Sequence, residues 1–366
     1  MENINLKHLK IRNFRSHKII DLDFNSQFIY FSGPNGVGKT NILEAISLFS
    51  PGRGLRSANI NDFTQNNGTN FWNLLALFKI SNVLIEIEIG LDSTGKKFLR
   101  IDGKKKPFVY LTEIFKIIWI TPLMDRLWIG GSSERRRFLD RLVMNFFPSH
   151  AKFCILYEQA LKKRNMLLKE NEKDVAWFLA IEKQLAEIGY SIDKYRRKVI
   201  NLLDQMQIEM RNSGHFPILQ IELSTDPIRN SEEFFEELQK ARNTDLKAKR
   251  TLIGPHKTDL MVHHSINKMQ AKNCSTGEQK SLLLSFFILS SLALSKKFKN
   301  PPIILLDEIV AHLDKDNLSI FLDQLISINA QIFATGTEIK NLDILPIDFL
   351  SYSLTWDKDK RKIFLN

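Results

Sequence analysis

The chain has 366 residues, of which 43% are hydrophobic and 25% charged, and its formal net charge is +11. This length exceeds that of a usual single domain, so we expect one large core with an appended or inserted module. The composition is that of a globular protein and excludes a disordered or fibrous chain. The positive charge favours a polyanionic partner such as nucleic acid, although a genome biased towards Lys, Asn, Ile and Phe gives a similar balance.

The two cysteines, Cys154 and Cys274, lie far apart in the sequence. This spacing excludes a disulfide framework and a CxxC metal pair, and it fits a reducing cytosol. The first 20 residues spread their charges and lack the apolar block of a secretory signal. The most apolar stretch, 282–294, is shorter than the roughly 20 residues that span a bilayer, which predicts a buried core helix and no membrane association.

Apolar clusters near the N-terminus predict three short strands, at 4–11, 19–24 and 28–31. The third runs into a Gly-rich loop at 33–40, and the apolar positions of 41–49 predict a core helix directly after that loop. Between residues 70 and 119, alternating apolar residues and turn signals predict an antiparallel ribbon beside the main sheet. We expect this ribbon to include the apolar run IIWI at 117–120.

Long helical patterns extend from residue 132 to about 211, with a polar break at 169–174. A strand-like segment at 216–223 and an acidic helix around 231–238 follow. Near Gly254 the chain rejoins the part of the protein that contains the Gly-rich loop. The pattern therefore predicts an α/β core with a mainly helical module inserted between its two halves.

Residues 33–40 read GPNGVGKT and satisfy the pattern GxxxxGK[ST], between a predicted strand and a predicted helix. Glycines at this spacing let backbone N–H groups curl around phosphate oxygens at the positive end of the helix. Lys39 would then neutralise the β- and γ-phosphates of ATP, and Thr40 would bind Mg²⁺. The predicted ATP-binding residues of this P-loop are Gly33, Pro34, Asn35, Gly36, Val37, Gly38, Lys39 and Thr40.

Residues 301–308 read PPIILLDE, a buried strand that ends in two carboxylates. Asp307 is placed to hold Mg²⁺ and Glu308 to polarise an attacking water. Such a run is common at strand ends when it occurs alone. In a chain that also has a P-loop, it predicts that Lys39, Asp307 and Glu308 carry the chemistry.

A third segment, STGEQ at 275–279, comes immediately before an apolar helix that we expect to begin near Lys280. A hydroxyl and a glycine N–H at a helix N-terminus form an anion pocket. An ordinary N-cap is the competing interpretation. The position of the segment shortly before Asp307 favours a nucleotide-binding role for its members, namely Ser275, Gly277, Glu278 and Gln279.

These three motifs in this order resemble the ABC-type ATPase, an α/β fold with a P-loop mixed sheet, an antiparallel β subdomain and an inserted helical domain. In that fold the signature segment completes the nucleotide site of a second protomer, and Asp314 would end the loop that crosses between the two sites. Within this class the chain is similar, nearly end to end, to the RecF family of bacterial recombination mediators. The similar segments are 11–17 (IRNFRSH), 33–56, 120–143, 253–260, 275–285 and 303–314.

The resemblance implies an N-terminal half of the ATPase domain at 1–120, an inserted helical domain at 121–252 and a C-terminal half at 253–366. It implies a cytoplasmic protein that dimerises with ATP and Mg²⁺ on single-stranded or gapped DNA and hydrolyses ATP slowly. It further implies recombinase loading with mediators of the RecR and RecO type, in DNA repair, replication restart and SOS induction. No nuclease activity is expected.

Two departures from the ABC pattern concern the γ-phosphate sensors. No Gln occurs at 119–125, and no His follows the strand at 331–337. Thr335 or Thr337 is a candidate substitute, and Glu308 stands where family members often carry Asp, which leaves the hydrolysis rate open. The alternative is a transporter-type or SMC/Rad50-like ATPase, which the missing Gln and His, the short insertion and the lack of a CxxC hook disfavour.

Five basic clusters are candidate contacts to DNA phosphates, with a solvated helix or turn face as the commoner role. They lie at 104–106, 135–137, 162–164, 196–198 and 247–250. The cluster at 135–137 is a candidate brace between the insertion and the ATPase core. His256, Lys257 and Asp259 predict a turn or an interdomain contact, and Cys274 a small, semi-buried thiol.

Overall fold

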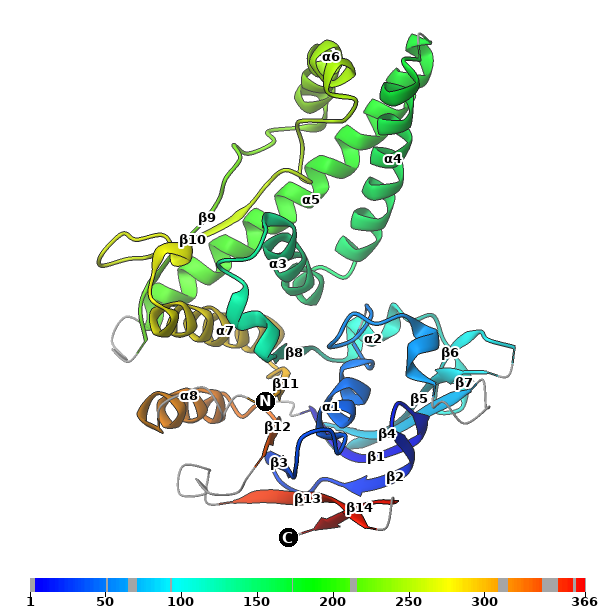
Figure 1. Ribbon diagram of the computed structural model, residues 1–366, viewed down its shortest axis with the longest axis vertical. Coiled ribbons are helices and arrows are strands. Elements are labelled where there is room, and N and C mark those ends of the chain that lie inside the picture. Colours follow the sequence, from blue (N-terminus) through cyan, green and yellow to red (C-terminus); the bar gives the residue numbers. More distant parts are fainter. Residues whose placement is uncertain are drawn as a thin grey trace. The chain divides into compact units, whose positions relative to one another are not determined.

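The computed structural model describes residues 4–50, 52–64, 71–92, 94–172, 174–210, 216–308, 315–337, 348–357 and 360–365. The chain divides into two compact units, which are residues 1–125 with 286–366, and residues 126–285. Figure 1 labels the helices and strands of both units. The first unit holds both six-stranded sheets, and the second holds the long helices.

A largely parallel sheet of the first unit has the strand order β14-β13-β3-β12-β11-β8. Its strands are β3 (Phe28–Ser32), β8 (Ile117–Ile120), β11 (Ile303–Leu306), β12 (Ile332–Gly336), β13 (Phe349–Asp357) and β14 (Lys360–Leu365). Four of these, β3, β8, β11 and β12, are buried along their whole length, as parallel strands covered on both faces are. Because β3, β12 and β11 run parallel, their carboxyl ends lie at one edge of the sheet.

The other sheet of the first unit is antiparallel, with the order β2-β1-β4-β5-β6-β7. Its strands are β1 (Ile4–Phe14), β2 (His17–Asp23), β4 (Trp72–Ile80), β5 (Val83–Leu91), β6 (Lys97–Ile101) and β7 (Lys104–Lys105). The predicted antiparallel ribbon is thus confirmed for β4 to β7. The prediction was wrong for IIWI, which forms β8 and pairs in parallel with β11, because an unbroken apolar run fits a strand buried on both faces.

The helices of the first unit are α1 (Lys39–Ser47), α2 (Tyr110–Ile114) and α8 (Lys315–Ser327), with 3₁₀ turns at Ile60–Phe63 and Pro122–Arg126. One hydrophobic core gathers side chains from both sheets and from α1. Its aromatic residues include Phe14, Phe24, Phe31, Trp72 and Phe78, each fully buried. The P-loop helix is therefore anchored in the core that both sheets share.

Helix α7 (Thr276–Phe298) begins in the second unit and ends in the first. It begins four residues before the predicted Lys280, because Ser275 and Glu278 cap its first turn. By length and composition it is apolar enough to cross a membrane, but 67% of its apolar window is buried inside the protein. The predicted buried core helix at 282–294 is confirmed, with Leu282, Phe286 and Leu294 fully buried.

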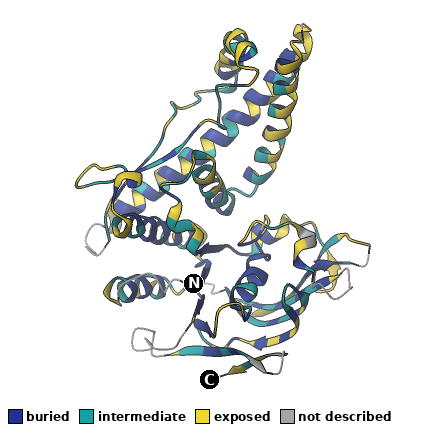
Figure 2. Ribbon diagram, viewed as in Figure 1, coloured by how far each residue is buried: buried dark blue, intermediate teal, exposed yellow. Residues whose placement is uncertain are grey.

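The second unit is mainly helical. It contains α3 (Ser132–Phe146), α4 (His150–Glu170), α5 (Val175–Met210), α6 (Ser231–Ala248), a 3₁₀ turn (Ala271–Asn273) and the antiparallel pair β9 (Leu219–Leu223) and β10 (Leu260–His264). The long helices predicted between 132 and 211 are confirmed, and α6 extends ten residues beyond the predicted end at 238. Figure 2 shows buried residues along α4 and α5. Tyr157 of α4, Leu185 of α5 and Phe234 of α6 belong to a second hydrophobic core.

Candidate functional site

The P-loop connects β3 to α1 through residues whose backbone conformations only glycine adopts without strain. Three of them have positive φ: Gly33 (142°), Gly36 (79°) and Gly38 (109°). A Cβ at Gly33 would lie 2.2 Å from the Leu354 carbonyl oxygen, and a Cβ at Gly38 would lie 2.6 Å from the His17 ring. No side chain caps the N-terminus of α1. The loop thus combines a tight backbone curl with an open helix N-terminus, as a phosphate cradle requires.

Within this loop, Pro34 and Asn35 are exposed, whereas Val37 is buried in the core. The Lys39 side chain is only 3% exposed, and its Nζ donates to the carbonyl oxygens of Gly33 at 2.7 Å and Pro34 at 3.0 Å. Burial lowers the pKa of Lys39, and the charges of Glu308 and Asp307 oppose that shift. The ammonium group is therefore held inside the curl that phosphate oxygens would enter.

Thr40 and Asp307 meet at the carboxyl edge of the parallel sheet. Thr40 Oγ1 donates to Asp307 Oδ1 at 2.8 Å, and Thr335 Oγ1 donates to the same oxygen at 2.9 Å. Burial raises the pKa of Asp307, the Thr40 and Thr335 hydrogen bonds lower it, and nearby Glu308 raises it further. A hydroxyl and a buried carboxylate are the hard oxygen ligands that suit Mg²⁺, whose charge would offset the cost of burying Asp307. The residues present fit a magnesium ion.

Glu308 follows Asp307 in a left-handed backbone conformation, with φ of 50°. Its backbone N–H donates to Thr335 Oγ1 at 3.0 Å, which pins this turn to the adjacent strand β12. A left-handed non-glycine residue carries strain of the kind that gathers at functional sites. The sequence suggested a phosphate contact for Thr335, and its fully buried hydroxyl instead bridges Asp307 and the Glu308 backbone. Thr337, the other candidate, is exposed just after β12.

Residues that the sequence analysis did not assign support the P-loop helix from outside. Glu44 of α1 is fully buried and accepts from Arg15 through both carboxylate oxygens, at 2.8 and 2.9 Å. Arg56 lies 3.5 Å from the same carboxylate. His17 Nε2 lies 2.9 Å from the Gly38 carbonyl oxygen. The sequence signal for these cationic partners is Glu44 itself. It lies among the apolar positions of a predicted core helix, and a carboxylate buried there needs a cation.

The signature segment forms a capping box at the start of α7. Ser275 Oγ and the Ser275 backbone N–H both donate to Glu278 Oε2 at 2.8 Å, and the Glu278 N–H donates to Ser275 Oγ at 3.3 Å. The Gln279 side chain turns inwards and donates to the Cys274 carbonyl oxygen at 2.9 Å. Trp128 Nε1 donates to the Gln279 carbonyl oxygen at 2.9 Å. The segment lies at the N-terminus of a helix, as predicted. It also has the hydrogen bonds of an ordinary N-cap, which was the competing interpretation.

The predicted site residues fall into two groups. The P-loop, Asp307 and Glu308 come together in the first unit, whereas Ser275 to Gln279 belong to the second. Gly277 leaves the first turn of α7 open, because a Cβ there would meet nothing within 4 Å. Asp314 lies outside the described residues. Cys274 is buried, more fully than the predicted semi-buried thiol, and burial raises its pKa.

Arginines in three of the predicted basic clusters point into the protein. Arg135 binds both carboxylate oxygens of Asp259 at 2.8 Å, and this contact lies within the second unit. Arg196 binds both oxygens of Asp140 at 2.8 Å, and Arg164 is fully buried. The suggestion that these clusters contact DNA was wrong for these side chains, because short-range carboxylate pairs already take them.

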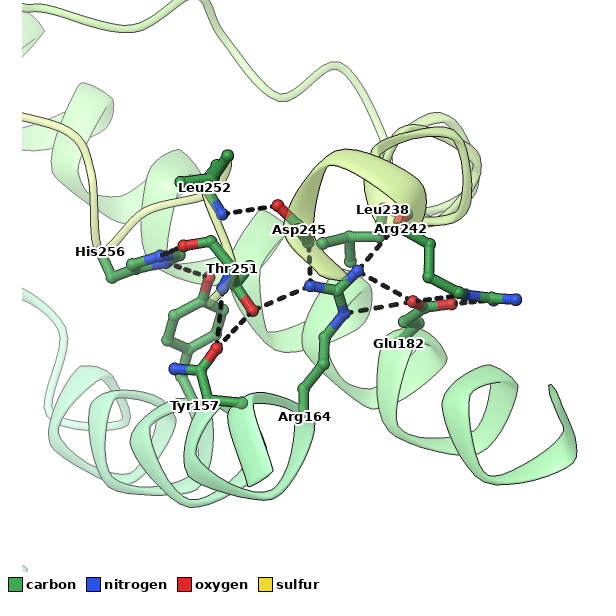
Figure 3. A network of polar contacts seen from close by, with 10 residues as sticks. Tyr157, Arg164, Glu182, Leu238, Arg242, Asp245, Thr251, Leu252 and His256 are labelled. Carbon is green, nitrogen blue, oxygen red and sulfur yellow. Dashed lines mark hydrogen bonds and ion pairs between the residues drawn. The ribbon is translucent and has the colours of Figure 1, made fainter. Parts of the chain in front are cut away.

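Arg164 is the centre of the polar network in Figure 3. Its guanidinium contacts Glu182 of α5 at 3.0 Å and Asp245 of α6 at 2.5 Å, and donates to Thr251 Oγ1 at 2.9 Å. Arg242 of α6 contacts the other oxygen of Glu182 at 2.6 Å. All charges of Arg164, Glu182 and Asp245 are buried, so the network ties three helices and the following turn into one arrangement.

The turn at 254–257 contains His256, which lies beside Tyr157 in Figure 3. His256 Nδ1 is 3.0 Å from the Tyr157 hydroxyl, and its Nε2 is 3.1 Å from the Thr251 carbonyl oxygen. Burial lowers the pKa of His256 to about 4. The prediction of a turn is confirmed, and the histidine acts as a neutral packing and hydrogen-bonding residue.

Asp140, His150 and Cys154 place potential metal ligands within 4.8 Å of one another. Arg196 already occupies both oxygens of Asp140, and His150 Nε2 lies 2.8 Å from Asp140 Oδ1. Burial raises the pKa of the Cys154 thiol to about 12, which opposes the thiolate that a metal needs. This chemistry fits an ion-paired brace between α3, α4 and α5 better than a metal site.

Comparison with known proteins agrees with this geometry. Residues 5–342 match the family described as RecF/RecN/SMC N terminal domain. The DNA replication and repair protein RecF of Rhizobium leguminosarum bv. trifolii is 37% identical over 347 residues, which cover 92% of this chain and 93% of that protein. The RecF of Mesorhizobium japonicum is 38% identical and covers 91% of each chain.

Solved structures share the fold. The recombination mediator protein RecF–ATP of the RecFOR pathway has a TM-score of 0.84 and 24% identity, with 99% of this chain and 98% of that chain covered. The Smc head domain of Pyrococcus furiosus, with an extended coiled coil, has a TM-score of 0.56, 18% identity, and covers 99% and 96% of the two chains.

The two sheets, the P-loop between β3 and α1, and the acidic end of β11 define an ABC-type ATPase head with an added helical unit. Within this class, the match over residues 5–342 and the identity to curated relatives decide the family. The chain belongs to the RecF family of DNA replication and repair proteins.

Proposed function

We propose that this protein binds ATP with Mg²⁺ at the P-loop and uses the bound nucleotide as a switch for holding DNA. The observation that carries the proposal is the Thr40–Asp307 hydrogen bond, which joins the phosphate-binding loop to the buried acid of β11. Lys39, held inside the loop, supplies the cation for the β- and γ-phosphates. The similar RecF–ATP structure supports the same ligand.

The chemistry of the switch rests on residues at this edge of the sheet. Magnesium supplies charge neutralisation for the phosphates when it is bound. Thr40 and Asp307 would hold it, and Thr335 keeps the Asp307 carboxylate oriented. Glu308 is placed one residue further, where its carboxylate would orient and deprotonate an attacking water. The absent Gln and His favour slow hydrolysis, which suits a nucleotide switch whose hydrolysis step releases the protein from DNA.

The second half of the proposal concerns dimerisation. Ser275, Gly277 and Glu278 at the open start of α7 would complete the nucleotide site of a second protomer. The resemblance to the family adds Asp314 to these nucleotide-binding residues. The inserted segment 121–252 would lie between ATPase halves 1–120 and 253–366. In the cytoplasm, such a dimer would engage single-stranded or gapped DNA and act with RecR- and RecO-type mediators to load recombinase, in repair, replication restart and SOS induction.

Filter binding with duplex, single-stranded and gapped DNA, each with and without ATP and Mg²⁺, tests the proposal. We expect retention to rise with ATP and to be greatest on gapped DNA, and we expect Lys39→Ala to lose the ATP-dependent part alone. Lys169→Ala, which removes the same charge from an exposed lysine of α4, serves as the matched control. Equal ATP-dependent retention by Lys39→Ala would refute the proposal.

A further inference from the structure

A cavity of about 1130 Å³ lies in the first unit, away from the P-loop residues, where the C-terminal ends of α7 and α8 meet the turn between β4 and β5. Its apolar surface comes from Leu292, Phe298 and Ile328. Phe298, the last residue of α7, is 36% exposed. This cavity, here the α7–α8 pocket, therefore offers a water-accessible apolar surface to a partner.

The polar part of the α7–α8 pocket is cationic and rich in hydrogen-bond donors. Lys296 and Lys299 line it, together with hydroxyl and amide groups such as those of Ser295 and Asn82. None of the described residues that line it is acidic. Carboxylates entering the pocket would find ammonium, hydroxyl and amide donors around an apolar floor.

Positive charge extends beyond the pocket lining. Lys116 Nζ lies 4.5 Å and Lys297 Nζ 5.7 Å from the centre of the Phe298 ring. Burial lowers the pKa of Lys116 to about 8, the charge of Lys297 lowers it further, and the charge of Glu113 opposes both effects. The lysines thus repel one another here, and an anionic ligand would relieve that repulsion.

Exposed aliphatic residues follow the lining residues Ser81 and Asn82 along the chain, at the start of β5. Val83 and Leu84 follow the β4–β5 turn, and their exposed fractions are 63% and 60%. Successive residues of a strand point to opposite faces, so one of these two exposed aliphatic side chains can extend the apolar surface beside the pocket. An extended segment could place one side chain in the pocket and a second one on this adjacent apolar surface.

We propose that the α7–α8 pocket docks a short acidic peptide segment of a partner protein, with an apolar side chain on Leu292, Phe298 and Ile328 and carboxylates on Lys296 and Lys299. We choose an acidic peptide because its carboxylates complement the lysines and its apolar side chain fits the apolar floor of the pocket. A DNA backbone needs the lysines but not the apolar floor. A stacked base would compete for the Phe298 ring with the ammonium groups of Lys116 and Lys297, which already lie over it.

Fluorescence anisotropy of a labelled Asp-Glu-Leu-Phe-Asp-Glu peptide with the full chain tests this docking site. We expect saturable binding that weakens at least about tenfold, or ~1.4 kcal/mol, in Lys296→Glu/Lys299→Glu. A peptide with Ser in place of Leu and Phe should weaken by a similar factor. The control variant Lys169→Glu/Lys183→Glu makes the same charge change on exposed lysines of α4 and α5 and should retain binding.

The same titration separates this site from the nucleotide switch. Lys39→Ala should bind the peptide as the unaltered chain does, because the pocket does not use the P-loop. Equal loss in both double charge variants, or equal binding of the Ser-containing peptide, would reduce the effect to bulk charge and overturn the proposal. Displacement of the peptide from the unaltered chain by a 20-nucleotide single strand, together with weaker binding of that strand to Lys296→Glu/Lys299→Glu than to the unaltered chain, would assign the pocket to DNA and also overturn it.

Discussion

Thr40 Oγ1 donates a 2.8 Å hydrogen bond to Asp307 Oδ1, which joins two residues that lie 267 positions apart in the chain. The bond exists because β3 and β11 run parallel with β12 between them, so that the P-loop helix and the acidic strand end share one edge. Thr335 at the end of β12 binds the same carboxylate oxygen. The relative position of Thr40 and Asp307, the two proposed magnesium ligands, therefore depends on the order of three neighbouring strands.

Replacing Thr335 by Val should weaken magnesium-dependent nucleotide binding. The valine has nearly the same shape but neither donates to Asp307 nor accepts from the Glu308 N–H. We expect ATP affinity in the presence of Mg²⁺ to fall, with stability lowered by about 1–3 kcal/mol from the unsatisfied groups. Calorimetric titration with Mg²⁺ and with EDTA measures this. Thr335→Ser should restore both properties, and an equal loss with EDTA would mean that Thr335 does not act through the metal.

Replacing Ser275 by Asp separates the helix cap from the nucleotide role. Asp caps a helix as well as Ser does, but its carboxylate cannot donate to Glu278 Oε2 as Ser275 Oγ does. The thermal unfolding midpoint of the free protein should therefore fall slightly, and Ser275→Asn, a neutral cap, is the control for that change. The negative charge of Asp would repel the phosphate of a nucleotide bound by a second protomer, so ATP-dependent dimerisation should be lost. Light scattering with ATP and Mg²⁺ reports the dimer. Unchanged dimerisation would reduce Ser275 to a cap.

Replacing Arg164 by Met should destabilise the second unit strongly. The change leaves the buried carboxylates of Glu182 and Asp245 without their shared cation. We expect the free energy of unfolding to fall by about 3–5 kcal/mol. Urea denaturation measures it. Adding Glu182→Gln and Asp245→Asn should recover much of the loss, and failure to recover would point to packing as the cause.

His256 should make stability depend on pH. Its folded pKa, about 4, lies below its ordinary value of 6.5. The unfolded chain therefore takes up the proton first, and the stabilisation present above pH 6.5 is lost as the pH falls towards 4. We expect the stability advantage of the unaltered chain over His256→Gln to shrink by about 2 kcal/mol from pH 7 to pH 5. An advantage that stays constant over this range, by urea denaturation, would contradict the burial of a neutral histidine.

The sequence predicts those parts of the site that local pattern defines. GPNGVGKT needs its glycines because three backbone angles are positive, and IILLDE has the apolar run of a strand covered on both faces. The long helices from 132 to 211 repeat apolar positions over many turns, which makes their prediction secure. Local chemistry and periodicity are sufficient for these elements.

The parts that pattern missed depend on which segments become neighbours. IIWI reads equally well in a ribbon or a parallel sheet, and only its pairing with β11 decides. Thr335 reaches Asp307 because β12 lies beside β11, an order that no local pattern gives. Arg164 lies among lysines in the sequence, yet its two carboxylate partners come from α5 and α6. Long-range pairing determines these roles.

Sedimentation velocity of the purified full chain with saturating ATP, Mg²⁺ and gapped DNA tests the central claim most directly. The account predicts a dimer on DNA that disappears without ATP and does not form with Lys39→Ala. A chain that remains monomeric under saturating ATP, Mg²⁺ and DNA, or a Lys39→Ala variant that dimerises as readily, would contradict it.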